Sequence, residues 1–497
     1  MLVSEASLET IVVSDLHLSE AQSIDERRPW WMAYKLRKFF VDEDFMRLLA
    51  HIESEAKGPV ELVLNGDIFD FDSVTQLPSD PQGRVDWLAR LRGLAAEEWM
   101  SLFKIDCILR DHEPCFAALG AFARRGHRVV FIIGNHDVEL HWPSVQKQIR
   151  VAMGLAPEPL IDAEPVVFCA WFYLSEGDTY ISHGHQYDRN CVDKSPIHPL
   201  ISVRGRPQVR IPFGDIACRY LLNGMGYFNP HAAENYIMSG GQYVRFFLRY
   251  VLATQPLLPW SWAWGAIVTF LVTLRSHWRP SMRDPLLIEQ RVEAIARNAQ
   301  VKPAVVRQLN ELNVPSAASN PFAILRELWL DRGLLFLAII YTAWQLVLTV
   351  NIATRISPWW GFAPFAAFMP AFVAYSSSVN PTVFRRPLLT RRRAELIHAI
   401  TGASRVVFGH THRPERCQIG PMGYFNGGFW SPAFREPQCL ERMGTQTFVW
   451  IRPESEGSVR TAALLEWPPG GLAPRAFSLG EHGCDGAADD DPAPSSG

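Results

Sequence analysis

Residues 128–137 read RVVFIIGNHD, an apolar run that ends in a glycine and three polar side chains. Residues 8–17 (LETIVVSDLH) and 60–67 (VELVLNGD) are also apolar runs that end in polar residues, with a glycine in the second. Short apolar runs bounded by glycine and polar residues are typical of buried strands. Helical spacing over 42–56 and 87–125 separates the three runs, which predicts an α/β sheet. In such sheets the functional groups lie at the carboxyl ends of the strands.

The same pattern returns after an interruption. Strands are predicted for TYIS at 179–182 and for RVVF at 405–408, and each is followed by glycine and histidine residues. Closing strands are predicted over 423–429 and 445–451.

The spacing of these strands predicts how the chain is divided. We expect one α/β core built from residues 1–200 and 395–478, with an insertion over 201–394. The tail 479–497 is acidic and rich in Gly, Ala and Pro, which predicts disorder.

Five short polar motifs directly follow predicted strands. Their oxygen and nitrogen donors are of the kind that bind a pair of hard or borderline divalent ions. The motifs are Asp15-Leu16-His17, Gly66-Asp67, Gly134-Asn135-His136-Asp137, His183-Gly184-His185 and Gly409-His410-Thr411-His412. We expect all of them at the same edge of one sheet. A glycine before an aspartate or an asparagine permits a sharp turn and a close approach of the backbone.

The spacing within the motifs suggests how two ions could be shared. Residues two apart in an extended segment point the same way, so Asp15 and His17 could hold one ion. His410 and His412 could each reach a different ion of a close pair, and Asp67 could bridge both. The alternative for Asp15 is a helix cap, which leaves His17 without an explanation.

This ordered set resembles the calcineurin-like metallophosphoesterase family over residues 1–200 and 395–455. The resemblance implies a two-sheet α/β sandwich flanked by helices, and hydrolysis of phosphate esters by a metal-bridging hydroxide. Nitrogen and oxygen donors favour manganese, with iron or zinc as alternatives. The implied ligands of one ion are Asp15, His17, Asp67 and His412, and those of the other are Asp67, Asn135, His183 and His410. By the same resemblance His136 is a general acid or charge stabiliser, and Asp137 orients it.

The residues around the motifs are similar to the branch that contains UDP-2,3-diacylglucosamine hydrolase, which cuts a pyrophosphate at the membrane surface during lipid A synthesis. The similar stretches are SDLHL at 14–18, NGDIF at 65–69 and GHTHRP at 409–414. That branch usually has Arg in place of His136. Its helical lid precedes the fourth motif, whereas the long insertion here follows His183.

Four further side chains near the motifs each have two interpretations. His185 is either substrate-facing or a structural partner of Asp188. Asp70, Asp188 and Arg189 either bind substrate or form solvated salt bridges.

The insertion contains three segments without Asp, Glu, Lys or Arg, namely 250–274, 333–354 and 356–384. A helix of about 20 residues crosses the hydrocarbon core of a bilayer. Because His183 and His410 must meet at one ion, the number of crossings between them must be even. We therefore predict that the second and third segments form a hairpin.

The charges around this hairpin predict its orientation. Five arginines follow it, namely Arg385, Arg386, Arg391, Arg392 and Arg393. The positive-inside rule then places the catalytic core at the cytoplasmic face of the inner or plasma membrane. Residues 250–274 would be interfacial or re-entrant, and 284–312 would form a lid or lie on the surface. The alternative is a buried helical cap on a soluble cytoplasmic enzyme.

The composition narrows the class of function. The 497 residues carry 48 Lys and Arg against 51 Asp and Glu, and this net charge of −3 excludes a general nucleic-acid coat. The apolar insertion offers no basic groove for a nuclease. The complete donor set argues against a scaffold that has lost its metals. The eight cysteines contain no C-x-x-C pair and are predicted to be free thiols.

We therefore expect a phosphoesterase that acts on a lipid-linked substrate at a membrane. The alternative is an anchored or soluble phosphodiesterase or phosphatase that acts on a soluble nucleotide or phosphoester.

Overall fold

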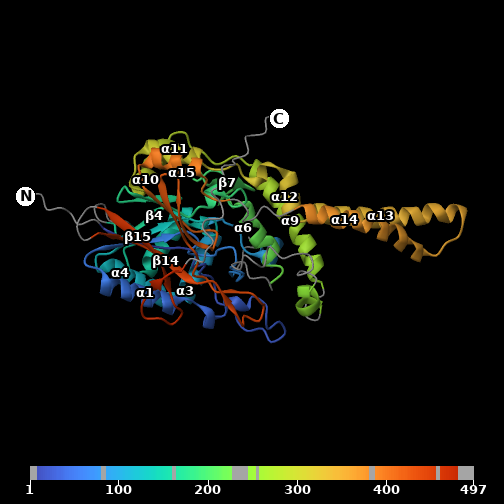
Figure 1. Ribbon diagram of the computed structural model, residues 1–497, viewed down its shortest axis with the longest axis horizontal. Helices are drawn as coiled ribbons and strands as arrows, with labels where there is room; N and C mark the ends of the chain where they lie inside the picture. Colours follow the sequence, from blue (N-terminus) through green and yellow to red (C-terminus); the bar gives the residue numbers. More distant parts are fainter. Residues whose placement is uncertain are drawn as a thin grey trace, which may run out of the picture.

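The computed structural model describes residues 8–79, 85–158, 164–226, 245–252, 257–379, 387–454 and 459–478. These residues form two β-sheets packed face to face, with helices on both outer faces (Figure 1). The predicted α/β sandwich of two sheets is confirmed.

The first sheet has seven strands and a parallel centre. β1 to β4 run parallel in chain order, and β14, β15 and β16 extend the sheet antiparallel beyond β1. In spatial order the strands are β16 (Arg475–Ala476), β15 (Arg460–Trp467), β14 (Gln446–Pro453), β1 (Glu9–Val13), β2 (Val60–Asn65), β3 (Arg128–Ile132) and β4 (Val166–Cys169). Every residue of β2 is buried, as expected for a parallel strand covered on both faces.

The second sheet has five strands. β6, β9 and β11 are parallel, and β5 and β10 pair antiparallel at the two edges. In spatial order the strands are β10 (Pro414–Ile419), β11 (Met422–Gly427), β9 (Arg405–Phe408), β6 (Thr179–Ser182) and β5 (Phe172–Ser175). β6 and β9 therefore bring two segments that are far apart in the sequence to the same edge.

The core between the sheets follows the two-residue period of the strands. In β1, Val12 points toward the second sheet and packs in the cluster that holds Ile181 and Val407. Its neighbours Ile11 and Val13 point the other way, into the layer of helices.

Helices cover both outer faces. The first sheet is covered by α1 (Asp42–Glu55), α3 (Glu98–Asp111), α4 (Glu113–Arg124) and α5 (Pro143–Ala152). The second is covered by α10 (Ile288–Asn298), α11 (Pro303–Glu311) and α15 (Arg391–Thr401). The stretch 284–312, predicted as a lid or a surface segment, thus supplies α10 and α11 to the outer layer. Val292, Val306 and Leu309 are buried there because they occupy one face of these helices.

Some predicted elements differ from the structure. The continuous helix expected over 87–125 is three helices, because Gly93 has a positive φ of 109° after α2 (Trp87–Arg92) and Pro114 lies in the first turn of α4. β4, β5, β10 and β15 were not predicted, since they are short or carry little alternation. Six described cysteines are free, whereas Cys417 is disulfide-bonded, so the prediction of free thiols is wrong for Cys417.

A helical region follows the short hairpin of β7 (Leu200–Val203) and β8 (Arg206–Val209). It consists of α6 (Phe213–Ala217) with the π-helical turn Cys218–Leu222, α9 (Leu258–Trp278), α12 (Pro321–Glu327), α13 (Leu330–Ala353) and α14 (Phe362–Ser378). α13 and α14 form a hairpin that projects from the globular body, with both ends at that body (Figure 1). Phe336 packs against Phe365 and Phe372 between the two helices.

Candidate dinuclear metal centre

Five loops meet at one edge of the sandwich. Those after β1, β2 and β3 belong to the first sheet, and those after β6 and β9 to the second. The prediction that one sheet carries every motif is therefore wrong. The backbone N–H of Gly409 donates to the His183 carbonyl (3.0 Å), and that of His410 donates to the Asp15 carboxylate (3.2 Å). The first bond joins the two loops of the second sheet, and the second ties them to the β1 loop of the first sheet.

One group of donors joins Asp15, His17 and His412, whose ligand atoms lie within 4.8 Å of one another. His412 Nε2 is 3.2 Å from Asp15 Oδ1 and 3.2 Å from His17 Nε2. Two imidazole nitrogens and a carboxylate oxygen that converge in this way can direct their lone pairs at one cation.

A second group joins Asp67, His183 and His410, again within 4.8 Å. His183 Nε2 is 3.0 Å from Asp67 Oδ2. The two groups are contiguous, because Asp67 Oδ2 is 4.0 Å from His17 Nε2 and Asp15 Oδ1 is 4.0 Å from His183 Nε2. Burial alone would raise the pKa of Asp67, but the His183, His136 and His17 rings hold it well below its usual range. Asp67 is therefore an anion between the two groups.

The side chain of Asn135, in the loop after β3, offers a further oxygen donor. Its Nδ2 donates to Asp215 Oδ1 (2.9 Å), while its buried Oδ1 has no hydrogen-bond partner among the described residues. Buried polar atoms are nearly always paired, so this oxygen suits a cation. The donor set of both groups thus fits a pair of divalent ions.

The partners of the histidine rings indicate which nitrogens face an ion. His183 Nδ1 donates to the Asn65 carbonyl (2.9 Å), which leaves Nε2 as the lone-pair nitrogen. His410 Nε2 is 3.0 Å from Asp188 Oδ2, which leaves Nδ1 for an ion. A carboxylate behind a ligating histidine fixes the tautomer and the ring orientation. Asp188, predicted to bind substrate, lies in this position behind His410.

The backbone of the ligand loops is not extended. Asp15, His17, Asp67, His410 and His412 all have φ between 46° and 67°, in the left-handed region that non-glycine residues rarely adopt. The extended segment predicted for Asp15 and His17 is therefore wrong, although the two side chains do converge. Strained φ values that cluster at one place are typical of functional sites.

The glycines of the motifs allow the loops to touch. A Cβ at Gly66 would lie 2.5 Å from the His183 ring, and one at Gly409 would lie 2.5 Å from Asp15 Oδ2. A Cβ at Gly134 would lie 2.3 Å from Asp67 Oδ1 and 2.5 Å from its backbone nitrogen. The close approach predicted for Gly66 and Gly134 is confirmed.

Replacing Gly134 by alanine is expected to lower kcat/KM about 100-fold, because a ligand carboxylate displaced by up to about 1 Å loses its productive geometry. The melting temperature should also fall. Steady-state kinetics and thermal unfolding of Gly134→Ala measure both effects. Gly58→Ala is the matched control, since nothing lies within 4 Å of its added Cβ. Wild-type activity in Gly134→Ala would contradict the tight contact with Asp67.

His136 lies beside the first group and faces three carboxylates. Its Nδ1 is 3.5 Å from Asp215 Oδ1, 3.6 Å from Asp70 Oδ1 and 3.8 Å from Asp72 Oδ2. Burial disfavours a charged ring, but Asp215, Asp67 and Asp70 raise the pKa of His136 well above its usual range. The ring is therefore a cation held at the edge of the donor groups.

Asp137 does not orient His136, so that prediction is wrong. Its carboxylate accepts the backbone N–H groups of Gly134 (2.6 Å) and Ile68 (2.9 Å). Both oxygens are thus occupied by the β2 and β3 loops, and the hydrogen bonds and ion pairs found among the described residues include none between Asp137 and the ring of His136. Asp137 instead ties together the loops that carry Asp67 and Asn135.

The comparison with known families agrees with this geometry. Residues 8–216 match the calcineurin-like phosphoesterase family. The matched part contains four of the five motifs, and the structure brings the fifth, at 409–412, to the same centre. A search of curated proteins found no match. The chain therefore carries a calcineurin-like metallophosphoesterase domain and is a metal-dependent phosphoesterase, whose family implies two divalent ions.

Two side chains predicted near the substrate lie in different surroundings. His185 is buried against His183, its Nε2 lies 3.0 Å from Gln186 Nε2, and its carbonyl accepts the backbone N–H of Asp188 (3.1 Å). Burial and the neighbouring His183 and His410 lower the pKa of His185 well below its usual range, so its ring is neutral. Arg189 is exposed. Asp188 is close to both His410 and Cys191.

Three residues of the phosphoesterase centre were not predicted from the sequence. Asp72 follows Asp67 and Asp70 in NGDIFDFD, and this cluster of three acids within six residues was a usable signal. Asp215 and Arg219 lie in the region 201–394, where no motif marks them. Arg219 Nη2 donates to Asp72 Oδ1 (2.6 Å) and lies 3.4 Å from Glu139 Oε1, and all three side chains are buried.

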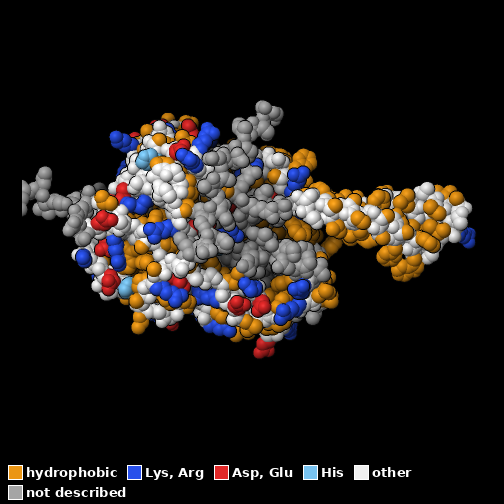
Figure 2. Space-filling model, viewed as in Figure 1, with side chains coloured by type: hydrophobic (Ala, Val, Ile, Leu, Met, Phe, Trp, Pro, Cys, Tyr) orange, Lys and Arg blue, Asp and Glu red, His pale blue; other side chains and the backbone are white. Residues whose placement is uncertain are grey.

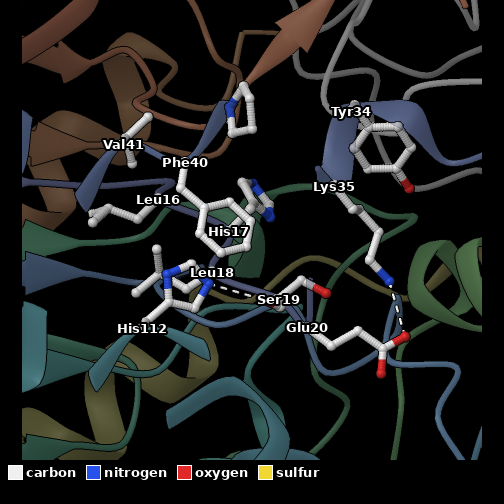
Figure 3. A pocket seen from close by; sticks show the side chains of 11 residues that line it. Leu16, His17, Leu18, Ser19, Glu20, Tyr34, Lys35, Phe40, Val41 and His112 are labelled. Atoms are coloured by element: carbon white, nitrogen blue, oxygen red, sulfur yellow. Dashed lines mark hydrogen bonds and ion pairs between the residues drawn. The ribbon is translucent and has the colours of Figure 1, made fainter. Parts of the chain in front are cut away.

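A small cavity lies behind His17 (Figure 3). Its volume is about 20 Å³, enough for about one water molecule. Lys35 lines it, but its Nζ is 3.1 Å from Glu20 Oε1, so its charge is neutralised. His112 Nε2 contacts the Ser19 carbonyl (2.8 Å) on the other side. The residues that line this cavity pack around the loop of His17. The cavity itself is too small for a phosphoester.

Proposed function

We propose that this phosphoesterase hydrolyses a phosphate ester or pyrophosphate of a lipid-linked, amphipathic substrate at the cytoplasmic face of a membrane. The phosphoester chemistry follows from the family and the donor groups. The lipid substrate and the membrane are supported by one observation above all, the exposed apolar surface of the α13–α14 hairpin.

The chemistry can be divided between ions and residues. Two divalent ions would supply Lewis acidity to the phosphate and activate water. Asp67, between the two groups, would hold them close together. His136 is kept charged by the carboxylates at Nδ1, and its Nε2 can then donate a hydrogen bond to a phosphate oxygen or a proton to the leaving group.

The hairpin exposes apolar side chains that a water-soluble protein would bury. α13 is the one helix among the described residues that is long and apolar enough to span a membrane, and 17% of its most apolar window is buried. No residue of α14 is buried. The exposed residues include Leu334, Leu337, Ile340, Tyr341, Trp344, Leu348, Ile352, Phe362, Phe368 and Val373. Figure 2 shows this apolar surface along the projection. Continuous apolar surface of this kind marks contact with lipid or protein.

The dimensions and the charges of the hairpin suit a bilayer. At 1.5 Å per residue, α13 is about 36 Å long and α14 about 26 Å, close to the roughly 30 Å of a hydrocarbon core. Polar contacts lie at the base, where Tyr375 Oη donates to Asp331 (2.7 Å) and Arg332 donates to the Val379 carbonyl (2.6 Å). Arg355 is at the opposite end, between the helices, beside Trp359 and Trp360. Tryptophan is typical of membrane interfaces.

α9 presents a second apolar surface at the root of the hairpin. Its exposed residues repeat at helical spacing and form one stripe, namely Trp260, Trp264, Ile267, Leu271 and Trp278. The carboxyl end of α9 is fastened to the core by Lys194, which donates to the His277 carbonyl (2.9 Å), and by Arg210, which donates to the Arg279 carbonyl (2.6 Å). A helix held in this way would keep the catalytic core at a fixed distance from the lipid.

A substrate panel tests the proposal. The full-length protein with manganese is incubated with UDP-2,3-diacylglucosamine, lipid monophosphates and soluble nucleotides, and the products are identified by mass spectrometry. We expect kcat/KM for a lipid-linked substrate to exceed that for its water-soluble analogue by at least about tenfold. The lipid part lies away from the reacting phosphate, and its binding energy can stabilise the transition state of the lipid-linked substrate alone. Turnover of soluble esters alone, unaffected by added lipid, would support the alternative of an anchored enzyme for soluble phosphoesters.

A further inference from the structure

A single carboxylate from the helical region contacts two consecutive residues of the GNHD motif. Asp215 lies on α6 and is fully buried. Its Oδ1 accepts the hydrogen bond from Asn135 Nδ2 (2.9 Å) and lies 3.5 Å from His136 Nδ1. The helical region therefore reaches the metal centre itself.

These contacts determine the orientation of the Asn135 amide. An amide group can be placed in two orientations, with either oxygen or nitrogen toward the centre. Asp215 Oδ1 accepts the hydrogen bond from Asn135 Nδ2 (2.9 Å), and this contact selects the orientation in which Nδ2 faces Asp215 and the amide oxygen faces away. Asn135 Oδ1 is buried and has no hydrogen-bond partner among the described residues.

Asp215 has no complete hydrogen-bond shell of its own. Its Oδ2 is buried without a hydrogen-bond partner among the described residues. A buried carboxylate with one unpaired oxygen costs stability unless a nearby charge compensates it. A purely structural role would be served better by an apolar side chain, so its contacts with Asn135 and His136 are the reason for its presence.

The surroundings of α6 hold Asp215 in place. Gly214 N–H donates to the Asn190 carbonyl (2.8 Å), and a Cβ at Gly214 would lie 2.8 Å from Cys191 Sγ. Four residues after Asp215, in the π-helical turn, Arg219 binds Asp72, which also faces His136. One short helical segment thus supplies two side chains to the surroundings of GNHD.

We propose that Asp215 is a positioning residue that turns the Asn135 amide oxygen toward one ion and holds His136 at the edge of the centre. This proposal rests on the dinuclear centre of the proposed function and deepens it. It means that residues outside the five motifs complete the site.

The test compares Asp215→Ala and Asp215→Asn in the full-length protein. Binding of Mn²⁺ alone is measured by titration calorimetry and by electron paramagnetic resonance, and kinetics are measured on the best substrate of the panel. We expect Asp215→Ala to weaken one of the two ions about 10- to 100-fold, the usual effect of removing a partner of a ligand. Asp215→Asn keeps an oxygen that accepts from Asn135, so its Mn²⁺ affinity should stay within about threefold, while kcat falls because His136 loses a negative neighbour.

Asp193→Ala is the matched control, because Asp193 is also buried and accepts a backbone N–H from Ser195 (3.0 Å). Its Mn²⁺ affinity should equal that of the wild type. Two tightly bound ions in Asp215→Ala, or an equal loss in Asp215→Asn and Asp215→Ala, would overturn the positioning role. If Asp215→Ala does not fold, the Mn²⁺ affinity and the kcat of Asp215→Asn test the positioning role. A wild-type protein that binds fewer than two ions would instead refute the dinuclear centre.

Discussion

Replacing Asp67 by asparagine is expected to lower kcat/KM at least about 1000-fold, equivalent to about 4 kcal/mol of transition-state stabilisation. The carboxylate lies 3.0 Å from His183 Nε2 and 4.0 Å from His17 Nε2, so it is near both donor groups. Neighbouring histidines keep it ionised, and asparagine removes that charge. The amide oxygen can still accept the backbone N–H of His136, a 2.8 Å bond in the native protein, so the fold should persist.

The number of bound ions distinguishes the role of Asp67 from that of Asp15. A bridging ligand serves both ions, so Asp67→Asn should lose both, whereas Asp15→Asn should retain one. Elemental analysis of the purified variants measures this. Asp106→Asn is the control, since Asp106 is exposed on α3 and far from the motifs in sequence. Two ions bound to Asp67→Asn would contradict the bridging assignment.

Placing two lysines on α13 is expected to release the protein from membranes. Ile340 and Trp344 lie near the middle of the helix and are 43% and 51% exposed. Lysine at the centre of a spanning helix costs about 2.5–3.5 kcal/mol, so Ile340→Lys with Trp344→Lys should cost about 5–7 kcal/mol. Flotation with liposomes and fractionation of cells measure the change.

A control with equal added charge separates this effect from general solubility. Leu440 and Leu472 are 80% and 83% exposed outside the helical region, so lysine at both should leave membrane binding unchanged. Mn²⁺ binding should be unchanged in both double variants, because all four side chains are exposed and none belongs to the donor groups. A hairpin variant that still floats with liposomes would contradict insertion of α13.

Local patterns in the sequence were sufficient to predict the ligand-bearing strands. β1, β2, β3, β6 and β9 all appear where apolar runs end in polar residues, because a buried parallel strand must be apolar and its functional groups must follow it. The strands β4, β5, β10 and β15 were missed, since pairing with neighbours stabilises them more than their own composition does. The sequence did not show where α10 and α11 would lie, and only the structure shows that they pack against the second sheet.

The sequence by itself determined which residues could bind ions and that residues 333–354 are apolar enough to cross a bilayer. Both properties depend on residue type and order alone. The tertiary structure decided that the motifs come from two sheets, that their backbone is left-handed, that Asp137 ties loops together, and that Asp215 and Arg219 surround GNHD. These features depend on contacts between segments far apart in the chain, and such contacts arise from the packing of sheets and helices, which no local pattern encodes.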